Sequence, residues 1–78
     1  MSNKGKTRDR GNYLNSHAFK RGFRDKLAGR WDDSIEYKWQ LIYEAGRFFA
    51  CYVKKDIDFR SETTFNLYKE AWREGIFL

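Results

Sequence analysis

The side chains best suited to chemistry in this chain are the Arg and Lys residues of its first thirty positions, which have aromatic residues close by. Arg and Lys donate charge-assisted hydrogen bonds to phosphate oxygens, and Tyr or Trp rings stack on unpaired bases. Tyr13 and Trp31 lie outside the interiors of the helices predicted below, so their rings are candidates for such stacking. Phe23 and Tyr37 also lie near basic residues, but their spacing favours a place in the core.

The positive charge is concentrated at one end of the chain. Residues 1–30 hold nine basic side chains and two acidic ones, a net charge of +7, whereas residues 31–78 carry −2. Such segregation produces a strong positive field, which favours polyanionic partners. Nucleic acid is the first candidate, because an anionic membrane would also need a helix with a free apolar face. The alternative is a solvated basic face that only keeps the protein soluble.

The chain lacks the residue sets that most catalytic and metal sites require. It has one histidine, His17, and one cysteine, Cys51, whereas a nucleophile needs a neighbouring base and a structural zinc site needs about four ligands. Its six glycines are too scattered for a phosphate-binding loop. Asp32–Asp33 fits a helix start better than a cation site, and Asp56 and Asp58 fit connector charges. We therefore expect a non-enzymatic protein with no metal and no cofactor.

The apolar pattern predicts where the protein resides. The longest uninterrupted apolar run is residues 48–53, too short to cross a membrane. No apolar stretch follows the basic N-terminal residues, so we expect no signal peptide. A single unpaired cysteine fits a reducing compartment. These features predict a cytoplasmic protein without a membrane partner.

Seventy-eight residues suffice for one small domain. Residues 1–14 are rich in Lys, Arg, Asn, Gly and Ser with little to bury, which predicts a flexible basic arm. The sequence pattern of residues 15–78 predicts a single helical domain. The chain has no proline and no sustained strand-like alternation, so we predict an all-α fold of three helices.

The first helix is predicted from Asn15 or Ser16, both good N-caps, to about Ala28, with Gly29 as its stop. One face is apolar and the neighbouring arc is basic, with Phe19, Phe23 and Leu27 on the first and Lys20, Arg21 and Arg24 on the second. A mid-helix glycine costs about 1 kcal/mol relative to Ala. We therefore expect Gly22 to permit the close approach of another helix.

The second helix is predicted to begin at a capping box formed by Asp33 and Glu36 and to run to about Val53. Apolar positions cover most of its circumference, so we expect it to pack on two sides. The expected faces are Ile35, Trp39, Ile42, Tyr43, Gly46, Phe49, Ala50 and Val53 on one side and Tyr37, Leu41, Ala45, Phe48 and Tyr52 on the other. Cys51 is expected as a small residue beside the core.

The third helix follows a charged connector over residues 54–60. It is predicted from a cap at Ser61 to about Glu74, with Gly75 as its stop. Its expected buried face is Phe65, Tyr68, Trp72 and Ile76. The oligomeric state is left open, although leftover aromatic surface would indicate a dimer.

Residues 18–30 carry a recognisable pattern of Ala, Arg-Gly-aromatic and, further on, an aliphatic residue before Ala-Gly-Arg. The matching positions are Ala18, Arg21, Gly22, Phe23, Leu27, Ala28, Gly29 and Arg30. This stretch resembles the first helix of the ribosome modulation factor family, small basic bacterial hibernation proteins. The family's second helix has an aromatic-x-x-Gly pattern, which Tyr43 and Gly46 match, so the resemblance covers residues 18–50. Ile35–Glu36 stands where the family commonly has Cys-Pro, and residues 54–78 have no counterpart in it.

The resemblance implies a protein that binds the small ribosomal subunit near the 3′ end of its RNA, hinders translation initiation and favours ribosome dimers. By the same matching, Arg21, Arg24 and Arg30 would face RNA. Charge and the stacking argument add further positions to this candidate RNA-binding set, namely Lys4, Lys6, Arg8, Arg10, Lys20 and Trp31.

Two function classes remain open at the level of sequence. The first is a non-enzymatic regulator that binds ribosomal RNA or the small ribosomal subunit through the basic arm and first helix. The second is a small protein-interaction module, for example a phage-type inhibitor of a host protein, acting through aromatic-rich helices. Duplex DNA binding is disfavoured, because the most basic helix is the most N-terminal one and no recognition helix follows a short turn.

Overall fold

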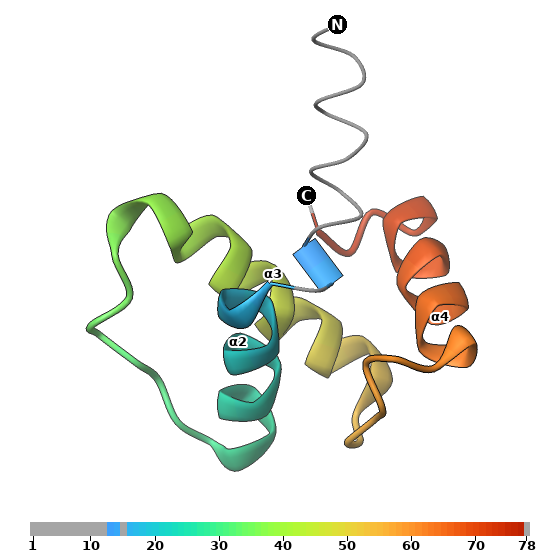
Figure 1. Cartoon of the computed structure of the whole chain (residues 1–78), viewed down its shortest axis with the longest axis horizontal. Coiled ribbons are helices and arrows are strands. Elements are labelled where there is room, and N and C mark those ends of the chain that lie inside the picture. The colour runs from blue at the N-terminus through green and yellow to red at the C-terminus, as the bar shows by residue number, and fades with distance from the viewer. Residues whose placement is uncertain (1–12, 15, 78) are drawn as a thin grey trace, which may run out of the picture.

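A computed structural model describes residues 13–14 and 16–77, and three helices lie within this described part of the chain. They are α2 (His17–Ala28), α3 (Tyr37–Val53) and α4 (Glu62–Arg73). Helix α2 packs mainly against α3, and α4 flanks α3 at its C-terminal end (Figure 1). No strand occurs among the described residues, so the all-α prediction is confirmed. The predicted arm lies outside the described residues over positions 1–12.

The ends of α2 and α4 follow the capping signals in the sequence. Ser16 accepts a hydrogen bond from the Phe19 N–H through its side chain, and Ser61 accepts one from the Thr63 N–H. Gly29 ends α2 in the left-handed conformation, at φ 73°. A side chain rarely adopts that conformation, which is why a glycine stops the helix.

The predicted start of α3 is wrong by three residues, because the cap is Glu36 and not Asp33. Asp33 lies in a turn instead of capping the helix, which begins at Tyr37 after Glu36. The Asp32 carboxylate accepts hydrogen bonds from the N–H and the hydroxyl of Ser34. This local turn competes with helix formation, because short acidic side chains bond their neighbouring backbone readily. Residues 29–36 therefore form an extended linker between α2 and α3 (Figure 1).

Helices α2 and α3 cross with their backbones in direct contact. A Cβ atom added to Gly22 would overlap the carbonyl oxygen of Tyr43 and lie 2.9 Å from its carbonyl carbon. A Cβ added to Gly46 would overlap the carbonyl oxygen of Phe19 and lie 2.8 Å from the carbon. The prediction for Gly22 is confirmed, and Gly46 is its counterpart on α3.

Aromatic rings from all three helices form the core around this crossing. Phe19 and Phe23 of α2 are fully buried and meet Phe49 of α3 at ring distances of 5.6 and 5.7 Å. Tyr68 of α4 lies edge-on to Phe19, 5.7 Å away. The core also includes Leu14, and Tyr13 packs on Trp72, so these two residues belong to the domain and not to the predicted arm.

One predicted face of α3 is only partly covered by the described elements: Ala45 is buried in the core, but most of its large side chains are not. Tyr37, Leu41 and Phe48, here called the outer stripe, are exposed, with Tyr37 at 90%. Cys51 follows on the same face and is exposed, not beside the core. Leu27 and Phe65 are also exposed against expectation, whereas Tyr52 is half-buried. The outer stripe is exposed because α2 and α4 both pack toward the other side of α3.

The close crossing of α2 and α3 predicts that Gly22→Ala lowers the free energy of unfolding much more than Gly29→Ala does. Gly22→Ala would force the backbones of α2 and α3 apart, because no side-chain rotation relieves a clash with a carbonyl group. We expect a loss of about 3 kcal/mol or more in unfolding free energy. Gly29→Ala meets no atom within 4 Å and carries only the left-handed backbone strain, about 1 kcal/mol. Thermal unfolding followed by circular dichroism measures both, and equal losses would contradict the close crossing.

Candidate nucleic-acid interface

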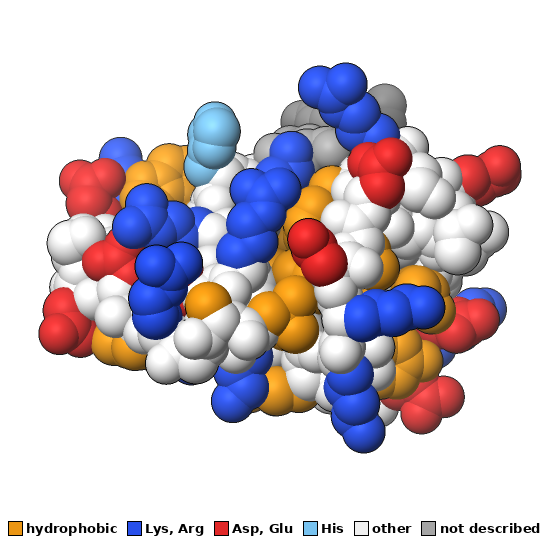
Figure 2. Space-filling model, turned by 90° about the horizontal axis from the view of Figure 1, so that it is seen from below, with side chains coloured by type: hydrophobic (Ala, Val, Ile, Leu, Met, Phe, Trp, Pro, Cys, Tyr) orange, Lys and Arg blue, Asp and Glu red, His pale blue; other side chains and the backbone are white. Residues whose placement is uncertain are grey.

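An open hollow of about 880 Å³ runs over the exposed side of α2 and the linker. Its lining consists of His17, Lys20, Arg21, Arg24, Asp25, Arg30, Trp31, Asp32 and Asp33. The five predicted RNA-binding residues within the described part of the chain all belong to this set. The other four, Lys4, Lys6, Arg8 and Arg10, lie outside the described residues. Figure 2 shows Lys and Arg side chains spread over one face of the molecule, with hydrophobic atoms exposed between them.

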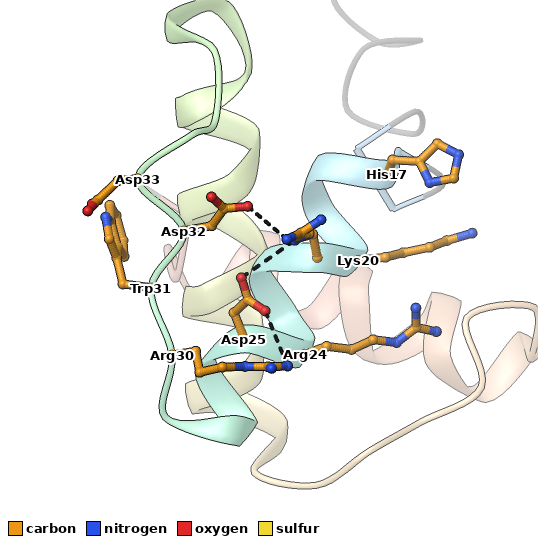
Figure 3. A pocket seen from close by; sticks show the side chains of 9 residues that line it. His17, Lys20, Arg24, Asp25, Arg30, Trp31, Asp32 and Asp33 are labelled. Atoms are coloured by element: carbon orange, nitrogen blue, oxygen red, sulfur yellow. Dashed lines mark ion pairs between the residues drawn. The ribbon is translucent and has the colours of Figure 1, made fainter.

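Lys20 and Arg24 form the free cationic rim of the hollow. With His17 they recur at helical spacing, and Figure 3 shows the three side chains pointing to the same side of α2. The Lys20 ammonium lies 6.0 Å from the centroid of the Phe59 ring, and the Arg24 guanidinium lies 5.8 Å from it. Neither side chain forms an ion pair with a described residue. Their charge is therefore available to an anionic ligand.

Arg21 and Arg30 are engaged by carboxylates instead. Arg21 lies 3.0 Å from an Asp32 oxygen and 3.8 Å from an Asp25 oxygen, and Arg30 lies 3.9 Å from Asp25. Figure 3 draws these ion pairs across the middle of the hollow. Both arginine side chains remain largely exposed, so the pairs mainly position the linker against α2.

A buried hydrogen-bond relay lies beneath these ion pairs. The Tyr43 hydroxyl donates to the Asp25 carboxylate at 2.7 Å and accepts from the Asp32 N–H at 2.9 Å. Burial of the hydroxyl raises the pKa of Tyr43, and the hydrogen bond to Asp25 adds to the rise. Sequence periodicity placed Tyr43 in the core, but it gave no sign that its hydroxyl joins α2, α3 and the linker.

Asp32 is held in its ionised form. The hydrogen bonds from the Ser34 hydroxyl and N–H lower the pKa of Asp32, and the nearby Arg21 guanidinium lowers it further. An ionised Asp32 keeps its attraction for Arg21 throughout the neutral pH range. The linker is thus tied to α2 by charge and to α3 by the Tyr43 hydroxyl.

Trp31 presents a partly exposed indole at the opposite end of the hollow from Lys20. Its ring lies edge-on to Tyr43 at 5.3 Å, and the Arg47 guanidinium lies over it at 4.7 Å. The same guanidinium donates a hydrogen bond to the Arg30 carbonyl oxygen. Arg47 therefore fixes the ring from α3, a role that the sequence did not reveal.

The charge of the hollow is more balanced than the charge of residues 1–30. Four Lys or Arg side chains share it with three carboxylates. Asp32 and Asp33 follow the basic segment in sequence and fold back beside α2. Positive potential is therefore concentrated at Lys20 and Arg24, away from the carboxylates.

Within 13–14 and 16–77, no three His, Cys, Asp or Glu side chains are grouped closely enough to hold a metal ion. None of the described helices is long and apolar enough to cross a lipid bilayer.

Comparison of the chain with protein-family models, with curated proteins and with solved structures finds no match.

The hydrogen bonds of the Tyr43 hydroxyl predict that the free energies of unfolding of the wild type and Tyr43→Phe differ by an amount that depends on pH. Below pH 10.0, the ordinary tyrosine pKa, the wild type is expected to be more stable by about 2 kcal/mol, because the variant leaves polar partners unsatisfied. The raised folded-state pKa means that the folded protein favours the neutral hydroxyl. The wild-type advantage should therefore shrink as the pH rises from 10.0 toward the folded-state value. Urea unfolding of both proteins across this range measures the difference, and a constant difference would contradict the relay.

Proposed function

We propose that this protein is a non-enzymatic RNA-binding regulator that docks on the small ribosomal subunit and represses translation. The observation that carries the proposal is a pair of cations, Lys20 and Arg24, that form no ion pair with a described residue and stand on the rim of a hollow that also holds the exposed Trp31 indole. Cations without carboxylate partners suit phosphate contacts, and an exposed ring fixed from behind suits stacking on an unpaired base.

The two halves of the hollow have different tasks in this proposal. Lys20 and Arg24 contact phosphates of the RNA strand. Arg21 and Arg30 keep the linker in place through Asp25 and Asp32, so that the Trp31 ring is held at a fixed position before RNA arrives. Such preorganisation reduces the entropy lost on binding.

The resemblance to the ribosome modulation factor family supports the choice of the ribosome as the target. The glycines of its two matching patterns, Gly22 and Gly46, meet at the crossing of α2 and α3. The two patterns therefore describe one packing unit, which presents the basic side of α2. A protein bound near the 3′ end of the small-subunit RNA would hinder initiation by occupying the surface that messenger RNA needs.

Charge reversal at the free rim tests the RNA contact. We expect Lys20→Glu with Arg24→Glu to weaken ribosome binding about ten-fold or more. Because two phosphate contacts are lost, the slope of log K against log [salt] should also become shallower by about 1.4. Co-sedimentation with bacterial ribosomes on sucrose gradients over a salt series measures both. Free RNA should compete, and duplex DNA should not.

The matched control is Lys26→Glu with Lys69→Glu. It produces the same change in net charge, but neither lysine lines the hollow. If both double variants weaken binding equally, the rim has no specific role and only the net charge matters. If the wild type stays at the top of the gradient at low salt, the ribosome proposal is lost.

A second function is favoured by the outer stripe of α3. Tyr37, Leu41 and Phe48 form an exposed apolar face, which is typical of a surface that binds another protein. A protein-interaction module of this kind would use aromatic anchors, with the basic hollow only adding solubility.

The same sedimentation assay separates the two functions. If protein contact drives binding, Leu41→Ser with Phe48→Ser should lower it about ten-fold or more, whereas Lys20→Glu with Arg24→Glu should leave it nearly unchanged. The RNA proposal requires the reverse order. Both residues are exposed, so the variant is expected to fold as the wild type does, which circular dichroism verifies.

A further inference from the structure

A second cavity, here called the Trp39 pocket, opens beside the basic hollow. It has a volume of about 500 Å³ and lies between the start of α2, the linker and the first turn of α3. His17 and Arg21 line both cavities, so the two adjoin at the exposed side of α2. A ligand that lies across Lys20 and Arg24 can therefore reach into the Trp39 pocket without leaving the protein surface.

The wall of this pocket that α3 provides is apolar. It lies at the first turns of α3, which no other described helix covers. Trp39 lies on the same side of α3 as Tyr43 and Gly46, which contact α2, yet it is 42% exposed. The first turns of α3 extend past α2 on the side of the linker, and α2 does not cover them (Figure 1). Ala18 and Ile35 complete the apolar wall. The indole thus offers a flat surface to a ligand.

The part of the pocket rim at Glu36 disfavours phosphate, whereas Arg21 lines the side that the pocket shares with the basic hollow. Glu36 lines the pocket, is exposed, and makes no side-chain capping bond although it precedes α3. A carboxylate repels a phosphate group, but it accepts hydrogen bonds from the N–H groups on the edge of a base. Phosphates are therefore expected at Lys20 and Arg24, and a base is expected inside.

We propose that the Trp39 pocket takes one unpaired base of the RNA strand whose phosphates contact Lys20 and Arg24. The base stacks on the Trp39 indole, with its N–H edge toward Glu36. This proposal rests on the RNA-binding function above and specifies its substrate as single-stranded RNA. The pocket volume falls within the range of about 300–1,000 Å³ found for small-molecule sites. Splayed bases stacked on aromatic side chains are a common mode of RNA recognition.

The test compares two probes that differ only in their bases. One is a mixed-sequence single-stranded RNA of about twelve nucleotides, and the other is the same length of abasic ribose-phosphate chain. We expect Trp39→Ser to weaken binding of the base-containing RNA about five-fold or more, and to leave binding of the abasic chain unchanged. Trp39→Phe, which keeps an aromatic ring, should restore most of the loss. Fluorescence anisotropy of end-labelled probes measures each affinity.

Phe65→Ser provides a matched control, because Phe65 is 43% exposed on α4 and lines neither cavity. Thermal unfolding verifies that Trp39→Ser folds, and Ile35→Ser offers a second change in the same wall.

If Trp39→Ser leaves both affinities unchanged while Lys20→Glu with Arg24→Glu lowers both, the pocket is refuted and the RNA-binding function stands. If the wild type binds neither probe, both proposals fail. If Trp39→Ser and Phe65→Ser weaken binding equally, the pocket has no special role.

Discussion

The close crossing of α2 and α3 at Gly22 and Gly46 is the contact on which the other described features depend. Each glycine lies against a carbonyl group of the opposite helix, so the backbones approach more closely than any pair of side chains would allow. Phe19 and Phe23 flank Gly22 on α2, and the crossing places their rings against Phe49. A domain of this size hides only about 60% of its chain surface on folding. Close backbone contact and large rings are how it gains enough burial.

The same crossing creates the polar side of the interface. It places Asp25 beside Tyr43, and a buried carboxylate is costly unless hydrogen bonds and opposite charges surround it. The Tyr43 hydroxyl, Arg21 and Arg30 supply these partners, and the hydroxyl also receives the Asp32 N–H of the linker. The arginines that the sequence marks as binding residues are therefore partly structural. Burial at the helix crossing decides which cations remain free.

Sequence patterns predicted those features that depend on near neighbours. The caps at Ser16 and Ser61 act within three residues, and both helix starts were predicted correctly. Periodicity also identified which residues of α3 share a face, but it carries no information about whether a partner covers that face, so the outer stripe was missed. The pairing of Arg21 with Asp32 depends on the path of the linker, and the contact of Arg47 with Trp31 depends on the angle of α3. Both contacts depend on the tertiary structure, which a count of charges along the sequence does not reveal.

The balance of charge in the hollow bears on how a basic protein could be selective. A chain with a net charge of +5 attracts any polyanion, and attraction of that kind carries no sequence information. Asp32 and Asp33 lie at the Trp31 end of the hollow, whereas Lys20 and Arg24 stand free at the other, so the surface is polarised. A strand bound there gains most when its phosphates follow the free rim and its bases turn toward the carboxylates and rings. A duplex buries its base edges and cannot meet both requirements together. The acidic residues that reduce the overall attraction would thus restrict binding to strands with unpaired bases.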